Sequence, residues 1–202
     1  MIVFEVNQSH YKNIESVLGN MQKNNKMVLK KAINATAKTA RKKFANTAKE
    51  KYALKTAGFN KSMTVKNATV SRLEANILSK GEAIELGKFK ASPFRYATGN
   101  NRPKEVKAKV LTTSTMKALI NGNTKAFVAK FRSGHIAIVE RDSNKKMKSD
   151  PKKAALRKLL SPSIPQMLGN EKRVYGIIEP EIEEILVQNI RAEVSKIMEA
   201  RK

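Results

Sequence analysis

The residues with the clearest potential for chemistry are a serine and a histidine on either side of one glycine. Ser133, Gly134 and His135 stand in the run RSGH, between two stretches of alternating apolar residues. A histidine can act as general base toward a serine hydroxyl, but this spacing alone does not establish the geometry of a catalytic triad. Turn residues beside a glycine are more often structural. We therefore interpret the three as a structural motif and expect no catalytic residues.

The second group is a set of carboxylates that forms the one acidic cluster of the chain: Glu179, Glu181, Glu183 and Glu184. Glu181, Glu183 and Glu184 could be imagined as metal ligands, but carboxylates in the first turn of a helix are favoured by the helix dipole. Cysteine is absent, the two histidines are far apart, and no glycine pattern for binding phosphate occurs. We expect neither a metal nor a cofactor.

A long basic helix is predicted over Asn25–Tyr52, the element around which the rest is organised. Small and apolar residues recur at spacings of three and four, without Gly or Pro, from Leu29 to Ala48. No acidic residue occurs between Ser16 and Lys49, so this helix cannot neutralise its lysines through ion pairs of its own. It needs a sheet for its narrow apolar stripe and an acidic partner, or solvent, for its charged side. Its candidate interface residues are Lys31, Lys38, Arg41 and Lys42.

The acidic partner is expected on a second amphipathic helix, from Pro180 to about Ala200. Proline is favoured at the first position of a helix, which would place the glutamates in its N-terminal turn. They could meet the basic helix within one subunit or across to a neighbouring copy. Glu181, Glu183 and Glu184 complete the candidate subunit interface.

Strands are predicted by period-two alternation over 1–6, 62–66, 72–79, 82–86, 124–131 and 135–141, and a short helix over 11–23. The best hairpin joins the last two strands through Arg132–Gly134, with Phe127, Ala129 and Phe131 on one face. Extended loops are expected at about 87–110 and 142–168, the latter with a basic stretch at 143–153. Pro162 and Pro165 forbid a continuous helix in the apolar run before residue 168, which we expect to dock against another surface.

The predicted fold is α+β: a single domain over 1–202, with an antiparallel β-sheet packed by the two helices. No run of apolar residues is long enough to span a membrane, so we expect no membrane partner. The net charge of +24 suggests contact with nucleic acid. However, specific base recognition favours arginine and single-strand binding favours aromatic residues, and both are scarce here. A basic nucleic-acid-binding protein therefore stays the alternative function.

Three segments together resemble the phage minor tail protein Z family, the tail completion proteins of long-tailed phages. They are ATVSRLEANILSKGEAIELGKF at 68–89, AFVAKFRSGHIAIVER at 126–141 and LLSPSIPQML at 159–168. The preceding basic, alanine-rich helix fits the same layout, and the similarity runs from about residue 26 to the C-terminus. The stretches 91–110 and 144–153 depart from it.

This resemblance implies a structural protein of the virion neck, assembled in the host cytoplasm, that completes the tail and joins it to the head. It implies a homo-oligomeric ring, a hexamer, with a tail terminator or tail tube protein and a head–tail connector as neighbours. Closed rings need two different complementary patches on each copy, and one basic and one acidic helix would supply them. The lysine-rich loops are usually solvated, although in a neck they could also lie near genomic DNA.

Overall fold

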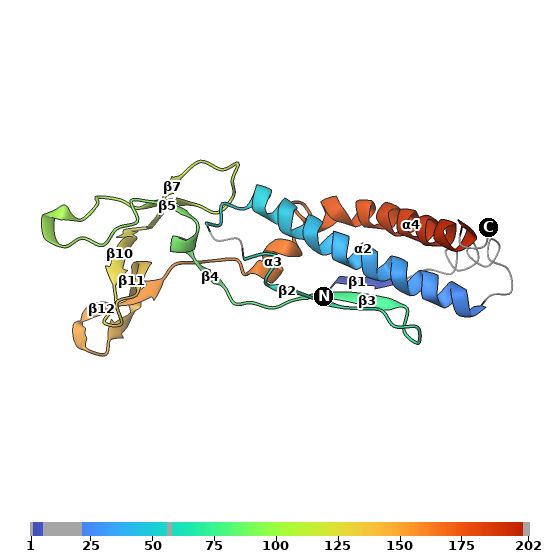
Figure 1. Cartoon of the computed structure of the whole chain (residues 1–202). Helices are drawn as coiled ribbons and strands as arrows, with labels where there is room; N and C mark the ends of the chain where they lie inside the picture. The colour runs from blue at the N-terminus through green and yellow to red at the C-terminus, as the bar shows by residue number, and fades with distance from the viewer. Residues whose placement is uncertain (1, 6–21, 56–57, 200–202) are drawn as a thin grey trace. The chain divides into compact units, whose positions relative to one another are not determined.

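The computed structural model describes residues 2–5, 22–55 and 58–199 (Figure 1). Its internal contacts gather in two compact units, where the sequence predicted one domain. The helical unit comprises Met1–Ala48, Gly58–Gly81 and Ile164–Lys202, and the β unit comprises Lys49–Ala57 and Glu82–Ser163. The predicted helix over 11–23 falls almost wholly outside the described residues.

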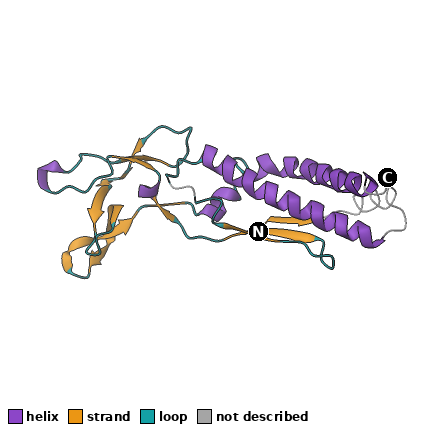
Figure 2. Cartoon of the chain, in the orientation of Figure 1, coloured by secondary structure: helices purple, strands orange, loops and turns teal. Residues whose placement is uncertain are grey.

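The α+β class, with a basic N-terminal helix and a C-terminal helix, is confirmed, although the strands form several small antiparallel sheets (Figure 2). The helical unit contains β1 (Ile2–Glu5), α2 (Gln22–Lys51, whose last three residues belong to the β unit), β2 (Met63–Lys66), β3 (Glu74–Ser79), α3 (Ile164–Leu168) and α4 (Tyr175–Glu199). The β unit contains β4 (Ile84–Glu85), η1 (Leu86–Lys88), β5 (Lys90–Ser92), η2 (Gly99–Asn101), β6 (Lys107–Lys109), β7 (Lys117–Ala118), β8 (Ile120–Asn121), β9 (Thr124–Lys125), β10 (Phe127–Lys130), β11 (Ile136–Met147), β12 (Asp150–Lys158) and β13 (Leu160–Ser161).

Helix α2 is the centre of the helical unit, and its apolar stripe is wider than the sequence pattern indicates. Leu29 and Ile33 are fully buried and share one core cluster with Ala75 of β3 and with Leu186 and Ile190 of α4. The helix therefore packs against a sheet and a second helix at once. The alanines of α2 are buried too, since small side chains allow both neighbours to approach its backbone closely.

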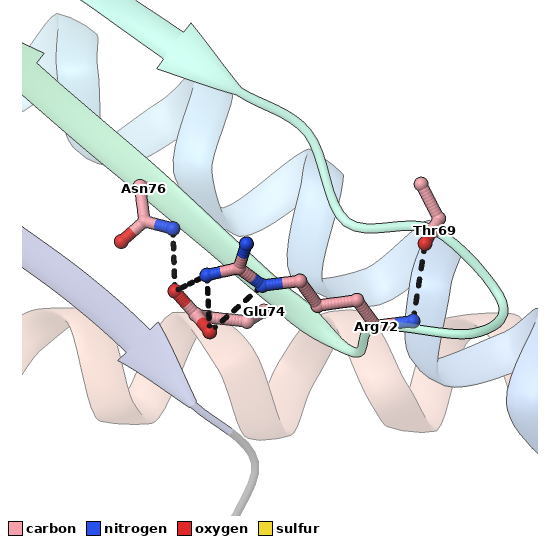
Figure 3. A network of polar contacts seen from close by, with 4 residues as sticks. All are labelled: Thr69, Arg72, Glu74 and Asn76. Carbon is pink, nitrogen blue, oxygen red and sulfur yellow. Dashed lines mark hydrogen bonds and ion pairs between the residues drawn. The ribbon is translucent and has the colours of Figure 1, made fainter.

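The sheet beside α2 has the order β1–β3–β2, and all its pairs are antiparallel. A short turn from Thr69 to Arg72 connects β2 to β3, with the Arg72 N–H donating to the Thr69 hydroxyl oxygen at 3.0 Å (Figure 3). Hydrogen bonds from Asn76 and Arg72 lower the pKa of Glu74, which the same view shows between them. These contacts order the start of β3 from residues close together in sequence.

Helix α4 begins five residues before the predicted start, so the expected position of Pro180 is wrong. Pro180 lies inside the helix, and no acidic residue lies in the first turn. The missing N–H of Pro180 leaves the Gly176 carbonyl without its usual helical donor, but Gly176 is exposed and water can serve instead. The acidic cluster therefore lies along the second and third turns, beyond the strongest effect of the helix dipole.

The predicted hairpin between β10 and β11 is confirmed in the β unit, with Val128 paired to Ile138 and Ala129 to Ala137. Gly134 has φ 84° and closes the turn, with the Phe131 N–H donating to the His135 carbonyl at 2.8 Å. Alternate residues of the hairpin face two separate apolar clusters. One includes Val128, Ile138, Leu86 and Val106, and the other includes Ala129, Val139, Phe127 and Phe131.

The stretches expected to be loops contain much regular structure. Residues 143–153, expected as a polar loop, form the far end of a hairpin because β11 continues to Met147 and β12 begins at Asp150. Residues 87–110 contain β5, β6, the 3-10 helix η2 and the last two residues of η1. Strand β4 is shorter than predicted and pairs with β13, distant in sequence. These strands were missed or misjudged because they pair through their backbones with segments distant in sequence, and a local sequence pattern does not predict such pairing.

Candidate interaction surfaces

The contact between α2 and α4 contains one buried polar link. The Asn189 side-chain amide donates to the Thr36 hydroxyl oxygen at 2.9 Å, and that hydroxyl donates to the Ala32 carbonyl at 2.9 Å. Thr36 is almost fully buried, so its polar atom must find a partner inside the helix pair. The link fixes the register of α4 along α2, and apolar contacts supply the bulk of the packing.

Part of the predicted basic–acidic pairing occurs within the chain. Lys43 forms an ion pair with Glu181 at 2.5 Å, and Lys31 approaches Glu193 at 3.9 Å. Arg41 is used in another way, since it donates to the Asn60 carbonyl at 2.8 Å. Lys31, Arg41 and Glu181 therefore have partners in their own unit. Exposed pairs of this kind contribute only about 0–1 kcal/mol each.

The other four candidate interface residues remain exposed: Lys38, Lys42, Glu183 and Glu184. No ion pair joins them to any residue in the described part of the chain. Glu183 and Glu184 border a shallow depression on α4 together with Pro180, Val187 and Arg191. Among the described residues, α2 thus carries a basic pair and α4 an acidic pair without ion-pair partners.

The motif around Gly134 is tied to the edge of the β unit by its histidine. His135 Nε2 lies 2.8 Å from Glu85 Oε2, and Lys158 donates to Glu85 Oε1 at 2.7 Å. Partial burial opposes ionisation of Glu85, but these hydrogen bonds outweigh it and hold its pKa below the ordinary value. Ser133 is exposed at the tip of the turn. The structure thus joins His135 to a carboxylate on β4 that the sequence analysis did not single out.

The apolar run that contains Pro162 and Pro165 ends in α3, which belongs to the helical unit. Pro165 is the second residue of α3, where the missing N–H costs no helical hydrogen bond. With Leu168 it lines a cavity of about 320 Å³ whose other walls include Met63, Ile77 and Tyr175. Pro162 lies just before this helix, after β13. The run is therefore partly helical, where we expected it to be extended.

A second group of functional candidates lies on the sheet β10–β11–β12, and the sequence analysis missed it. Glu140 is buried and forms an ion pair with Arg157 on the neighbouring strand. Hydrogen bonding to this carboxylate raises the pKa of Arg157. The period-two alternation along β11 could have shown that Glu140 faces inward. Its partner Arg157 could not have been identified, because it lies on β12, a strand that was not predicted.

Cationic side chains cover the aromatic rings on the opposite face of this sheet. The guanidinium groups of Arg102 and Arg141 each lie 5.7 Å from the centre of the Phe127 ring. The Lys158 amine lies 5.4 Å from the centre of the Phe131 ring, against which His135 also stacks. Such contacts stabilise cations on an apolar surface by about 0.5–1 kcal/mol when exposed.

Metal clusters and membrane-spanning helices are both absent among the described residues. No group of three or more His, Asp or Glu side chains among them could hold a metal ion. None of the helices within the described ranges has both the length and the apolar character needed to cross a membrane.

The chain matches no family model, no curated protein and no solved structure with which it was compared.

Proposed function

We propose that this chain is a structural subunit of a ring at the head-proximal end of a phage tail, where it completes the tail and joins it to the head. The observation that carries the proposal is the pair of unmatched surfaces on the helical unit. Lys38 and Lys42 on α2 and Glu183 and Glu184 on α4 are exposed and unpaired within the described chain. The resemblance of three segments to the tail protein Z family supports the same role.

Contact between the basic pair of one copy and the acidic pair of the next is heterologous, and such a contact forms a ring when the rotation between successive copies closes. A single exposed ion pair contributes little, about 0–1 kcal/mol. In a ring of six copies, two pairs per contact would be repeated at every junction. Electrostatic contacts of this kind also select the correct neighbour and speed its approach.

Charge reversal tests this proposal directly. A variant with Glu183→Lys and Glu184→Lys should fail to assemble at low salt, and so should one with Lys38→Glu and Lys42→Glu. An equimolar mixture of the two variants should assemble again as an alternating ring, because every junction then joins a basic pair to an acidic pair. The quadruple variant, with both pairs reversed, should also assemble by itself. Mass photometry and negative-stain microscopy report the oligomer and its shape.

A matched control reverses two exposed acidic residues elsewhere, Glu82→Lys and Glu199→Lys, and should assemble normally. If both interface variants assemble like the parent chain, the ring contact does not use these residues. A parent protein that stays monomeric at all concentrations would contradict the ring itself.

In the phage, loss of the protein should leave full heads and tails of normal length unjoined. The expected neighbours are a tail terminator or tail tube protein below and a connector above.

The second candidate is a basic nucleic-acid-binding protein that acts as a monomer. It is favoured by the distribution of charge, because the β unit alone holds 22 Lys and Arg against seven Asp and Glu, a net charge of +15. Oligomeric state separates the two candidates: the ring protein assembles at micromolar concentration, and the alternative does not.

A further inference from the structure

The β unit has one sheet face that its own apolar core does not cover. Alternate residues of β10 and β11 turn Val128 and Ile138 toward a cluster that includes Leu86 and Val106 from elsewhere in the unit. The opposite face, here called the aromatic face, carries Phe127, Ala129, Val139, Phe131 and Leu156. Among the described residues, every member of that second cluster belongs to the three strands and their turn. Its covering is supplied by cationic side chains instead.

These cations are held in place by contacts within the unit. Arg141 donates to the Ala154 carbonyl at 2.8 Å while it lies against the Phe127 ring. Lys158 is anchored by Glu85 over the Phe131 ring. An anion that approaches this face therefore meets positive charge whose position is already fixed, and it pays little entropy for ordering the side chains.

The far end of the β11–β12 hairpin extends the same positive surface. It carries four exposed lysines without an ion pair in the described chain, here called the tip lysines: Lys145, Lys146, Lys148 and Lys152. Lys146 lies opposite Ala154 in the ladder, and therefore on the side of the sheet that Arg141 reaches. At the hairpin end Lys153 pairs with Asp150, and farther along β12 Lys158 and Arg157 pair with Glu85 and Glu140. The hairpin end thus keeps an excess of positive charge.

The geometry favours a duplex over a single strand. Each phenyl ring already has two close neighbours, which compete with a base for stacking, the contact on which single-strand binding depends. Lysine acts as a point charge and suits phosphate contact without base recognition. Strand β12 has nine residues, a length of about 30 Å. That is close to one turn of B-form DNA, at about 34 Å.

We propose that the cations over the aromatic face, Arg102, Arg141 and Lys158, act together with the tip lysines. They bind the phosphate backbone of duplex DNA without sequence preference. The argument does not depend on ring formation, because all of these residues belong to one β unit of one chain.

The test is the binding of a fluorescein-labelled, random-sequence 30-base-pair duplex, followed by anisotropy between 50 and 200 mM NaCl. A variant with Lys145→Gln, Lys146→Gln, Lys148→Gln and Lys152→Gln should bind less tightly, by at least about 100-fold at 0.1 M salt. The slope of log K against log salt should fall by about 3 to 4, since each phosphate contact contributes about 0.9.

A control variant removes the same charge from exposed lysines of the helical unit: Lys26→Gln, Lys61→Gln, Lys66→Gln and Lys80→Gln. Its affinity should change by less than about tenfold, because these lysines lie outside the proposed surface and make none of its phosphate contacts. Equal losses in both variants would show that binding follows net charge alone and would overturn the assignment.

Two further probes decide the class of partner. A 30-nucleotide single strand of the same composition should bind more weakly than the duplex, and equal affinity would refute the choice of duplex. In 0.15 M salt the parent chain should bind phosphatidylglycerol vesicles no better than the control variant does. If instead the parent chain binds vesicles but not the duplex, and the tip variant loses the vesicle binding, the surface would be assigned to membranes. Failure of this inference can be told from failure of the proposed function. A tip variant that loses duplex binding but still forms rings would support both, and a parent chain that binds duplex as a monomer would support this inference alone.

Discussion

Asn34 of α2 is the most informative single position for testing how the helical unit is held together. Its side-chain amide donates to the Ala68 carbonyl at 3.1 Å, and its side-chain oxygen accepts from the Ala68 N–H at 2.7 Å. Ala68 follows β2 and is 2% exposed. One side chain therefore satisfies both backbone groups of a buried residue and ties the sheet to the helix.

Asn34→Ala should lower the free energy of unfolding by about 2–3 kcal/mol. Two lost hydrogen bonds cost about 1 kcal/mol each, and leaving the buried donor and acceptor unsatisfied adds to this. Two effects reduce this loss of stability. Water can enter because Asn34 is only half-buried, and alanine has the better helix propensity, worth about 0.6 kcal/mol. In a chain of this size the melting temperature should fall by about 5–10 °C.

Urea denaturation followed by circular dichroism at 222 nm measures this loss, with the slope of the transition checked for constancy. Asn46→Ala is the matched control, since Asn46 is exposed on the same helix. It should leave stability unchanged or raise it by about 0.5 kcal/mol. If the two variants have the same stability, the bonds to Ala68 contribute nothing net and our account of this contact is wrong.

Two further predictions follow from the same reasoning about close contacts and charge. Gly176→Ala should lower the free energy of unfolding by roughly 1–3 kcal/mol in the same urea assay, because a β-carbon there would lie 2.5 Å from the Glu171 carbonyl oxygen. Unchanged stability would show that the turn before α4 relaxes freely. Glu85 has a lowered pKa in the folded state, so its stabilising contribution is complete above its ordinary pKa of 4.5 and is lost as the pH falls through the lower, folded value. The parent chain should therefore lose stability more steeply below about pH 4.5 than Glu85→Gln does, and parallel curves would contradict this.

The helices could be predicted from the sequence because their signals are local. A stripe of apolar residues without Gly or Pro is enough to identify α2, and its bounds differ from the prediction by three residues or fewer. The start of α4 was misplaced for a physical reason. Proline at a first helical position is a common pattern, but an exposed glycine four residues earlier lets the helix accept Pro180 inside its second turn.

The candidate surfaces were only partly predictable, because a sequence shows which charges exist and not which of them find partners. Lys31 and Arg41 looked equivalent to Lys38 and Lys42, yet the first two are engaged within the unit. Pairing depends on where α4 and the residues after β2 lie around α2. Such contacts join residues far apart in sequence, so only the structure separates the occupied charges from the free ones.

The hairpin of β11 and β12 shows most clearly why strand formation escaped local reasoning. Residues 143–153 are lysine-rich and lack apolar alternation, a composition typical of a solvated loop. Strand structure there continues a ladder that begins in the buried part of β11, and Arg141 braces it by bonding across to the Ala154 carbonyl. Once that ladder has formed, extending it needs no apolar side chains, since backbone pairing alone suffices. The same absence of apolar residues leaves its end charged and exposed, and this is the property on which the proposed contact with DNA depends.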